Sequence, residues 1–300
     1  MNMSSEEICG FLVNEKRKQI WACELEMVQI CLDICKKHNL KIFASGGTLL
    51  GAIRHNGFIP WDDDIDMMMP REDYEKFLDV VENEIPTCFF AQSIRTDKNY
   101  PNGHFQLRNN KTTAFIGLSY NYLKLNKNEG VWVDIFPYDY VSEDESEYQK
   151  KSKKLLNYKK LALWGMEKRP GLKMRLKNIL FKLKFKSVNY YSLKIDEISR
   201  SQKESNLVGL QSFMPGYKKN VWNKEWFDEI TYHEFNGISM PIPVHYDEVL
   251  KTEFNNYMEL PKIKNGTVHG ECFFNLLKPY SDYKNLNYNE FLDLFNKIDY

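Results

Sequence analysis

The stretch from residue 41 to residue 78 constrains the fold and the chemistry more than any other part of the chain. It reads KIFASGGTLLGAIRHNGFIPWDDDIDMMMPREDYEKFL. A short strand is expected at residues 41–44, followed by a Gly-Gly turn and a short helix that Gly57 and Pro60 end. A second strand is expected at residues 65–69, next to a run of aspartates. The stretch therefore predicts a phosphate-sized turn close to a cluster of carboxylates.

The aspartates Asp64 and Asp66 alternate along the expected strand, so both side chains should point to the same face. Two carboxylates at such a spacing repel each other unless a cation lies between them. Asp134 is the one acid in the apolar run VWVDIF, where an unpaired carboxylate would be costly. We expect Asp64, Asp66 and Asp134 to bind Mg²⁺, or Mn²⁺ in its place.

The glycine turn is the candidate phosphate site. It lies between a strand and a helix, where bare backbone N–H groups and a helix N-terminus meet. Two basic side chains just beyond it can add charged donors. A Gly-Gly turn alone is usually only a turn, so the prediction depends on its combination with the acids. The expected donor-binding residues are Ser45, Gly46, Gly47, Thr48, Arg54 and His55.

The rest of the chain predicts an α/β (α+β) fold with a mixed sheet and flanking helices. Apolar residues three, four and seven apart predict a long helix over residues 12–38. Short β runs are expected between residues 87 and 136, and a hairpin is expected over residues 233–243. Residues 143–202 read as two or three helices, broken near Pro170-Gly171.

Composition excludes several classes of protein. Basic and acidic residues both number 41, so the chain as a whole is not a polyanion binder. The N-terminus lacks the pattern of a secretory signal, and we expect no membrane-spanning helix. The six cysteines form no C-x-x-C pair, which suits free thiols in a reducing compartment. We therefore expect a cytoplasmic protein.

One segment departs from this charge balance. Residues 150–186 contain fourteen Lys or Arg and one acid, Glu167, with leucines and aromatic residues interleaved. A solvated helical face is one interpretation, and a peripheral contact with anionic lipid at the inner face of the membrane is another. We expect no nucleic acid as a partner, because no recognised reader motif accompanies the charge.

Three blocks of this sequence resemble the LicD family of phosphotransferases, which is related to the fukutin proteins. The first is GGTLLGAIRHNGFIPWDDDID with the PREDYEKF helix that follows it, the second is VWVDIFPYD at 131–139, and the third is IPVHYDEVLKTEFNNYMELP at 242–261. The resemblance covers residues 20–270. The third block departs from the family, because FNNYM replaces a run similar to Tyr-Gly-Asp-Tyr-Met.

The resemblance implies a nucleotidyltransferase-type fold and a reaction. Residues 1–142 would form the catalytic core with the N-terminal helix, 143–202 a basic helical segment, and 203–300 the C-terminal part of the same catalytic unit. The donor would be CDP-choline or a similar CDP-alcohol, and the acceptor would be a sugar hydroxyl on a glycan or a lipid-linked sugar. Asp134 would complete the metal site and accept the hydroxyl proton.

Two alternatives stay open at this point. A true nucleotidyltransferase would use the same carboxylates to attack the α-phosphate of a nucleoside triphosphate. A non-enzymatic protein that binds membranes through residues 150–186 would need none of them. If the donor carries choline, its quaternary ammonium group should meet an aromatic cage. The aromatic candidates near the motifs are Trp61, Trp132, Tyr138 and Tyr140.

Overall fold

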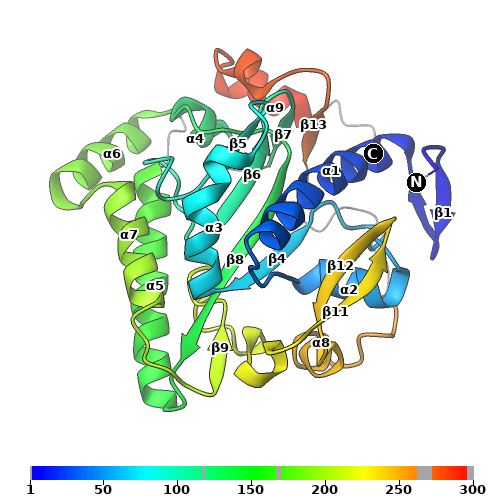
Figure 1. Cartoon of the computed structure of the whole chain (residues 1–300). Coiled ribbons are helices and arrows are strands. Elements are labelled where there is room, and N and C mark those ends of the chain that lie inside the picture. Colours follow the sequence, from blue (N-terminus) through cyan, green and yellow to red (C-terminus); the bar gives the residue numbers. More distant parts are fainter. Residues whose placement is uncertain (1, 117–118, 167–169, 262–271, 296–300) are drawn as a thin grey trace.

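A mixed β-sheet built around the long strand β8 (Trp132–Val141) forms the centre of the molecule (Figure 1). The computed structural model describes residues 2–116, 119–166, 170–261 and 272–295. Strand β4 (Asp66–Pro70) pairs with β8 in parallel, and the other pairings of the sheet are antiparallel. The remaining strands of the sheet are β3 (Phe43–Ala44), β5 (Phe89–Gln92), β6 (Phe105–Asn109), β9 (Leu207–Gly209) and β10 (Val221–Asn223). The expected mixed α/β architecture is confirmed.

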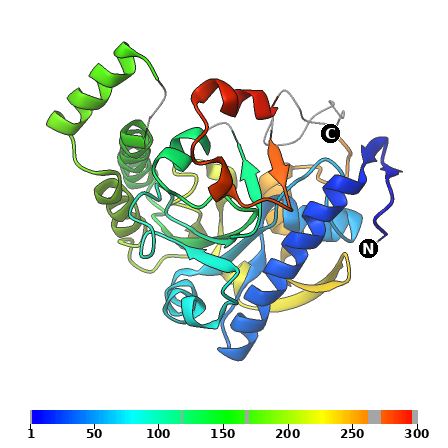
Figure 2. The same ribbon diagram turned by 90° about the horizontal axis from the view of Figure 1, so that it is seen from above.

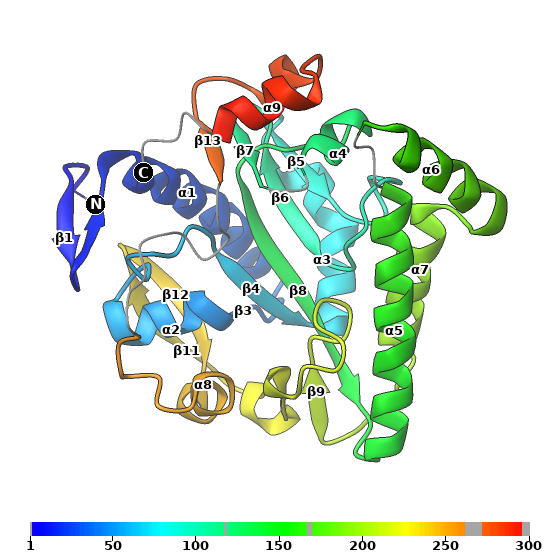
Figure 3. The ribbon, with the colours of Figure 1, turned by 180° about the vertical axis from the view of Figure 1, so that it is seen from behind.

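Two helices, α1 (Glu15–Lys37) and α3 (Arg71–Glu84), cover one face of this sheet (Figures 1 and 3). The side chain of Asn14 caps α1 by accepting a hydrogen bond from the Arg17 backbone N–H at 2.9 Å. Apolar residues of both helices at helical spacing are buried against the strands. The helix expected over residues 12–38 is therefore confirmed, with its first residue three positions later.

A second group of elements lies next to β3, at the edge of the sheet (Figures 1 and 3). It contains α2 (Gly46–His55), the hairpin of β11 (Ile230–Phe235) and β12 (Ile238–Pro243), and α8 (Tyr246–Phe254). The hairpin turns at Asn236-Gly237, where both residues have positive φ as a tight two-residue hairpin requires. Helix α2 packs against both β11 and α8. The expected hairpin is confirmed.

The basic part of the chain forms three helices at the edge of the molecule. Helices α5 (Glu145–Met166) and α7 (Val188–Ser199) pack side by side, and α6 (Leu172–Lys184) projects outward beyond them (Figures 1 and 2). The expected break near Pro170-Gly171 separates α5 from α6. Glu167 lies outside the described residues.

The remaining elements are short. Strand β13 (Phe273–Asn275) pairs with β7 (Thr113–Phe115) and thereby brings the C-terminal part of the chain back to the core. The strand expected over residues 113–118 ends at Phe115, and its last two residues lie outside the described part. None of the described helices combines the length and the apolar content that crossing a membrane requires. These elements are β1 (Glu6–Ile8), β2 (Phe11–Val13), β7 (Thr113–Phe115), α4 (Ser119–Lys124), η1 (Lys218–Asn220), η2 (Lys224–Phe227), β13 (Phe273–Asn275), η3 (Tyr280–Tyr283) and α9 (Tyr288–Phe295).

Candidate active site

The site is built where the parallel strands β4 and β8 begin side by side. Asp66, the first residue of β4, stands opposite Asp134 in the strand register. The Asp134 backbone N–H donates to the Ile65 carbonyl at 3.0 Å, which extends the pairing by one residue. Since the strands are parallel and in register, the two aspartates from distant parts of the chain come together at this end of the sheet.

Asp64 was expected on the same strand as Asp66, and this detail is wrong. Strand β4 begins only at Asp66, and Asp64 lies in the extended segment before it. The reason is that the ladder of β3 with β4 covers only Met67 and Met68 before the chain turns into α2, so it does not extend to Asp64. The expected outcome still holds, because carboxylate oxygens of Asp64, Asp66 and Asp134 all lie within 4.8 Å of one another.

The donor set fits a hard divalent cation. Burial raises the pKa of Asp64 well above its usual range, and the carboxylates around it, Asp66 first, raise it further. Asp62 and Asp63 contribute to this field, and together with Asp64 they form an overlapping trio of carboxylates within the same 4.8 Å limit. Several carboxylate oxygens at one point are the ligands that Mg²⁺ prefers. A cation there would relieve the repulsion that the pKa of Asp64 reports.

The glycine turn lies directly against these acids. A Cβ atom on Gly47 would lie 2.5 Å from Asp62 Oδ2, so no larger residue fits there without a shift. Gly46 has a φ of +50°, which favours glycine, and begins α2. Thr48 Oγ1 accepts a hydrogen bond from the Asp66 backbone N–H at 2.8 Å. Ser45 precedes the helix, and its backbone N–H donates to the Asp66 carbonyl at 3.0 Å. The turn and the carboxylates are therefore held as one unit.

Helix α1 holds the loop that carries the acids in place. The guanidinium of Arg17 and the indole N–H of Trp21 both donate to the Asp62 carbonyl, at 2.9 and 3.1 Å. The Trp21 ring stacks on Phe58, with ring centroids 4.6 Å apart. Two side chains of one rigid helix thus set the position of the Asp62 backbone, which leads into Asp64.

The two basic residues at the end of α2 are Arg54 and His55. Arg54 lines the cavity described below, but its Nη1 donates to the Tyr257 carbonyl at 2.7 Å, so it also holds the segment after α8. Its Nε donates to Nε2 of His55 at 2.9 Å. Burial and the neighbouring Arg54 lower the pKa of His55 to about 4, so this imidazole is neutral near pH 7. The role of both residues toward a phosphate stays a prediction.

These features open onto one cavity of about 670 Å³. Five of the residues expected at the site line it, namely Gly47, Arg54, Asp64, Asp66 and Asp134. Segments far apart in the sequence supply the other side chains. Those that the sequence did not single out include Asn102, His104, Gln106, Ile116, Phe136, Phe213, Met214 and Glu259.

His104 is the most informative of the residues that sequence reasoning missed. Its Nε2 lies 3.0 Å from Asp134 Oδ1, while the indole N–H of Trp132 donates to Asp134 Oδ2 at 2.8 Å. Burial opposes ionisation of Asp134, but His104 foremost, with Gln106 and Arg108, holds the pKa of Asp134 below its usual range. Burial lowers the pKa of His104 in turn, against the pull of Asp134. His104 therefore helps to keep Asp134 ionised and in place.

Glu253, on the last turn of α8, is a further acid near the site that the sequence did not indicate. Its side chain is buried, and burial together with the charge of Asp66 raises its pKa to about 8. The one sequence signal for Glu253 is its position on the face of α8 that packs against the core. It adds to the concentration of carboxyl groups at this end of the sheet.

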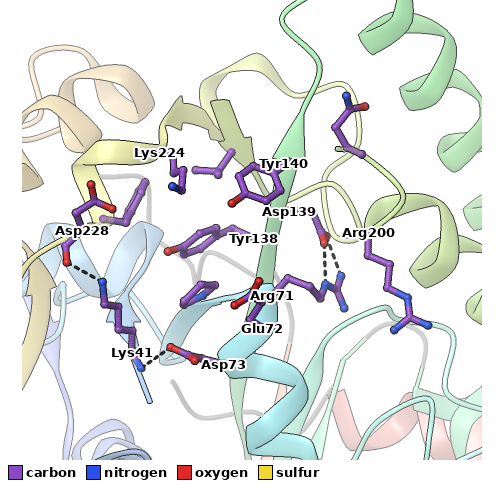
Figure 4. A pocket seen from close by; sticks show the side chains of 14 residues that line it. Lys41, Arg71, Glu72, Asp73, Tyr138, Asp139, Tyr140, Arg200, Lys224 and Asp228 are labelled. Atoms are coloured by element: carbon purple, nitrogen blue, oxygen red, sulfur yellow. Dashed lines mark hydrogen bonds and ion pairs between the residues drawn. The ribbon is translucent and has the colours of Figure 1, made fainter. Parts of the chain in front are cut away.

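Of the four aromatic residues expected near the site, two lie at the carboxylate cavity and two do not. Trp61 and Trp132 line the cavity. Tyr138 and Tyr140 do not, because they lie further along β8 and line a different cavity of about 520 Å³ (Figure 4). They share the alternation of Asp134, but a strand rises about 3.3 Å per residue, which places Tyr138 roughly 13 Å away. As a cage at the carboxylate site, this pair of tyrosines is wrong.

The sequence of this chain is similar to those of several known proteins. The lipopolysaccharide cholinephosphotransferase LicD of Haemophilus influenzae is 27% identical over 265 residues, which cover 81% of this chain and 94% of that protein. An uncharacterized protein of Rickettsia typhi is 32% identical over 84 residues, 27% of this chain and 25% of its own length. Another, from Rickettsia prowazekii, is 34% identical over 76 residues, 24% of this chain and 26% of its own length.

The residues that match a known family include the candidate site. Residues 39–177 match the family described as LicD/FKTN/FKRP, nucleotidyltransferase domain. This range contains the glycine turn, Asp64, Asp66, Asp134 and His104. The chain therefore carries a LicD-family domain over residues 39–177, and its carboxylate site lies inside that domain.

Proposed function

We propose that this chain transfers a phospho-alcohol, with phosphocholine as the first candidate, from a CDP-linked donor to a sugar hydroxyl. The acceptor would be a cell-surface glycan or its lipid-linked precursor. The observation that carries the proposal is that three carboxylates and the start of α2 converge on one cavity. The named activity of the Haemophilus relative supports the choice of phosphocholine.

Asp64, Asp66 and Asp134 are the residues that would hold Mg²⁺, or Mn²⁺ in its place. The ion would supply positive charge for the phosphate oxygens of the donor. The backbone N–H groups at the start of α2, at Gly46 and Gly47, bind the same phosphates from the other side. Arg54 stabilises the negative charge of the leaving nucleotide.

The chemical step is a substitution at phosphorus. The acceptor oxygen forms a bond to the phosphorus that carries the alcohol, and the bond from this phosphorus to the bridging oxygen breaks. CMP leaves with the bridging oxygen, and the hydroxyl proton passes to Asp134. His104 and Trp132 hold the two oxygens of Asp134 in place for this transfer.

Aromatic side chains beside the carboxylates support phosphocholine as the first candidate. Trp61, Trp132 and Tyr257 line the cavity together with the carboxylates. Aromatic faces attract a quaternary ammonium group through the ring quadrupole. CDP-ethanolamine or a CDP-alditol would gain less from these rings, so donor preference reports on whether they are used.

Incubation with CDP-choline, CDP-ethanolamine and a CDP-alditol in the presence of Mg²⁺ and glycan acceptors tests the proposal through CMP release. We expect CMP to appear with CDP-choline and to depend on the acceptor. Asp66→Asn should abolish release, whereas Asp33→Asn, the same substitution at an exposed position of α1, should not. No CMP with any donor, or wild-type release by the Asp66 variant, would contradict the proposal.

Nucleotidyl transfer is the second candidate, because the matched family is described as a nucleotidyltransferase domain. In that reaction the acceptor attacks the α-phosphorus of a nucleoside triphosphate, and pyrophosphate leaves. The same carboxylates serve both reactions. Pyrophosphate release from a nucleoside triphosphate, without CMP release from any CDP-alcohol, would select this alternative. A purely binding protein would produce neither product.

A further inference from the structure

Helix α6 exposes an unusual amount of aliphatic surface. Its five aliphatic residues are between 54% and 80% exposed, and Phe181 is its one buried residue. Soluble proteins scatter single exposed leucines over the surface, but a continuous group of five marks an interaction site. The exposed residues are Leu172, Leu176, Ile179, Leu180 and Leu183.

These five residues form one stripe along the helix. With about 100° between successive residues, they fall within an arc of about 100° that lies opposite Phe181. Basic residues border the stripe on both sides, and α6 contains no acidic residue. The bordering residues are Lys173, Lys177 and Lys184 on one side and Arg175 and Lys182 on the other.

The opposite side of α6 is fixed to the protein. The Phe181 ring packs edge-on against Trp164, with centroids 5.4 Å apart, and stacks on Phe185 at 5.3 Å. A Cβ atom on Gly165 would lie 2.8 Å from the Phe181 ring, so α5 is shaped to accept it. The helix cannot rotate its aliphatic stripe inward without losing these contacts. The stripe therefore faces away from the protein, and α6 projects from the edge of the molecule (Figures 1 and 2).

We infer that the aliphatic stripe of α6 docks on the surface of an anionic lipid bilayer. An apolar arc bordered by cations on both sides matches the boundary between acyl chains and negatively charged head groups. A second copy of the chain is a poorer occupant, because the two basic borders would repel each other. The lysine stems extend the apolar surface while their charges reach the head groups.

This inference does not depend on the proposed reaction, because it rests on α6 alone. It does complement that reaction, since docking by α6 would hold the catalytic domain at a surface where lipid-linked sugars are found. Residues 39–177 of the LicD-family match include only the first part of α6. Lipid binding and CMP release can be measured separately, the first with vesicles and the second with a soluble acceptor.

Flotation of the full chain with vesicles tests the inference. One vesicle contains equal parts of phosphatidylglycerol and phosphatidylcholine, and the other contains phosphatidylcholine alone. We expect the protein to float with the anionic vesicle at low salt, to remain at the bottom with the neutral one, and to detach as salt is added. Recovery at the bottom with both vesicles would overturn the inference.

Variants identify the surface responsible. Leu176→Ser/Leu183→Ser and, separately, Lys173→Gln/Lys182→Gln should each reduce the floating fraction at least severalfold. Leu277→Ser is the control, because Leu277 is 97% exposed and lies outside α6. Every substituted side chain is exposed, so melting temperature and CMP release with a soluble acceptor should stay at wild-type values. Flotation of the leucine variant like wild type, or lipid-independent self-association through the same leucines, would refute docking by α6.

Discussion

The two ends of the paired strands β4 and β8 differ in how the negative charge of buried carboxylates is balanced. Both ends bury carboxylates. At the far end, Arg71 follows β4 directly and forms two hydrogen bonds with Asp139 of β8, at 2.7 and 2.8 Å (Figure 4). It also binds Asp196 of α7 at 2.8 Å. The pKa of Asp64, by contrast, reports an excess of negative charge at the beginning of the strands.

The difference distinguishes the end of the strands that stabilises the fold from the end that forms the candidate active site. A guanidinium shared by two buried carboxylates satisfies them permanently and ties α3, β8 and α7 together. Carboxylates that crowd one another, with Glu253 buried nearby, leave the folded protein under repulsion that a cation would relieve. The cavity in Figure 4 also holds charged groups, but Lys41 and Arg71 in it are already engaged by protein oxygens.

Asp64→Asn should give the largest effect and the clearest test of this contrast. We expect the rate of CMP release to fall about a thousandfold, roughly 4 kcal/mol in activation free energy, because a ligand of the divalent cation is lost. The metal-free variant should unfold no earlier than wild type, because the substitution removes repulsion. Melting with and without Mg²⁺ measures the second part. The Mg²⁺-dependent rise of wild type should be absent in the variant, and a strongly destabilised metal-free variant would contradict the contrast.

Arg71→Met at the far end should lower stability and leave activity unchanged, which is the opposite of the effect expected for Asp64→Asn. It leaves Asp139 buried without its cation and Asp196 with only the longer contact to Arg200, which should lower the free energy of unfolding by roughly 3 kcal/mol. Urea titration measures the loss, and CMP release per folded molecule should stay close to wild type. Arg200→Met is the matched control, because Arg200 is half exposed and its contacts with Asp196 and Glu75 are longer. That control should cost less than about 1 kcal/mol. Equal losses in the two variants would show that the far end is not the structural one.

The sequence predicted the parts of this contrast that are local. The period of α1, the Asn236-Gly237 turn and the acids beside the glycine turn are all features of short stretches. The register of β4 against β8 is not, and neither is the antiparallel placement of β6 that brings His104 to Asp134. The same limit explains Tyr138, which is near the motif in the sequence but lies further along β8 and lines a different cavity. Long-range pairing decides which side chains share a cavity.

Glu253→Gln tests the same contrast through the pH dependence of stability. The pKa of Glu253 rises from 4.5 to about 8 on folding, so the folded state binds the proton more tightly. This residue therefore lowers the stability of wild type progressively as pH rises from about 4.5 to 8, and the penalty is complete above pH 8. The glutamine variant should become more stable than wild type over that window, by on the order of 4 kcal/mol at pH 8, because a tenfold change in proton affinity corresponds to about 1.4 kcal/mol. Urea titrations at pH 5 and pH 8 measure the difference.

Two further measurements complete this test. Glu248→Gln on the exposed side of the same helix should show no such divergence between pH 5 and pH 8. Mg²⁺ should reduce the advantage of Glu253→Gln, because a cation bound by Asp66 removes part of the negative field that raises the pKa of Glu253. A stability difference that is independent of pH would mean that Glu253 is not part of the charge excess. A pH-dependent difference that Mg²⁺ leaves unchanged would place the cation away from Asp66.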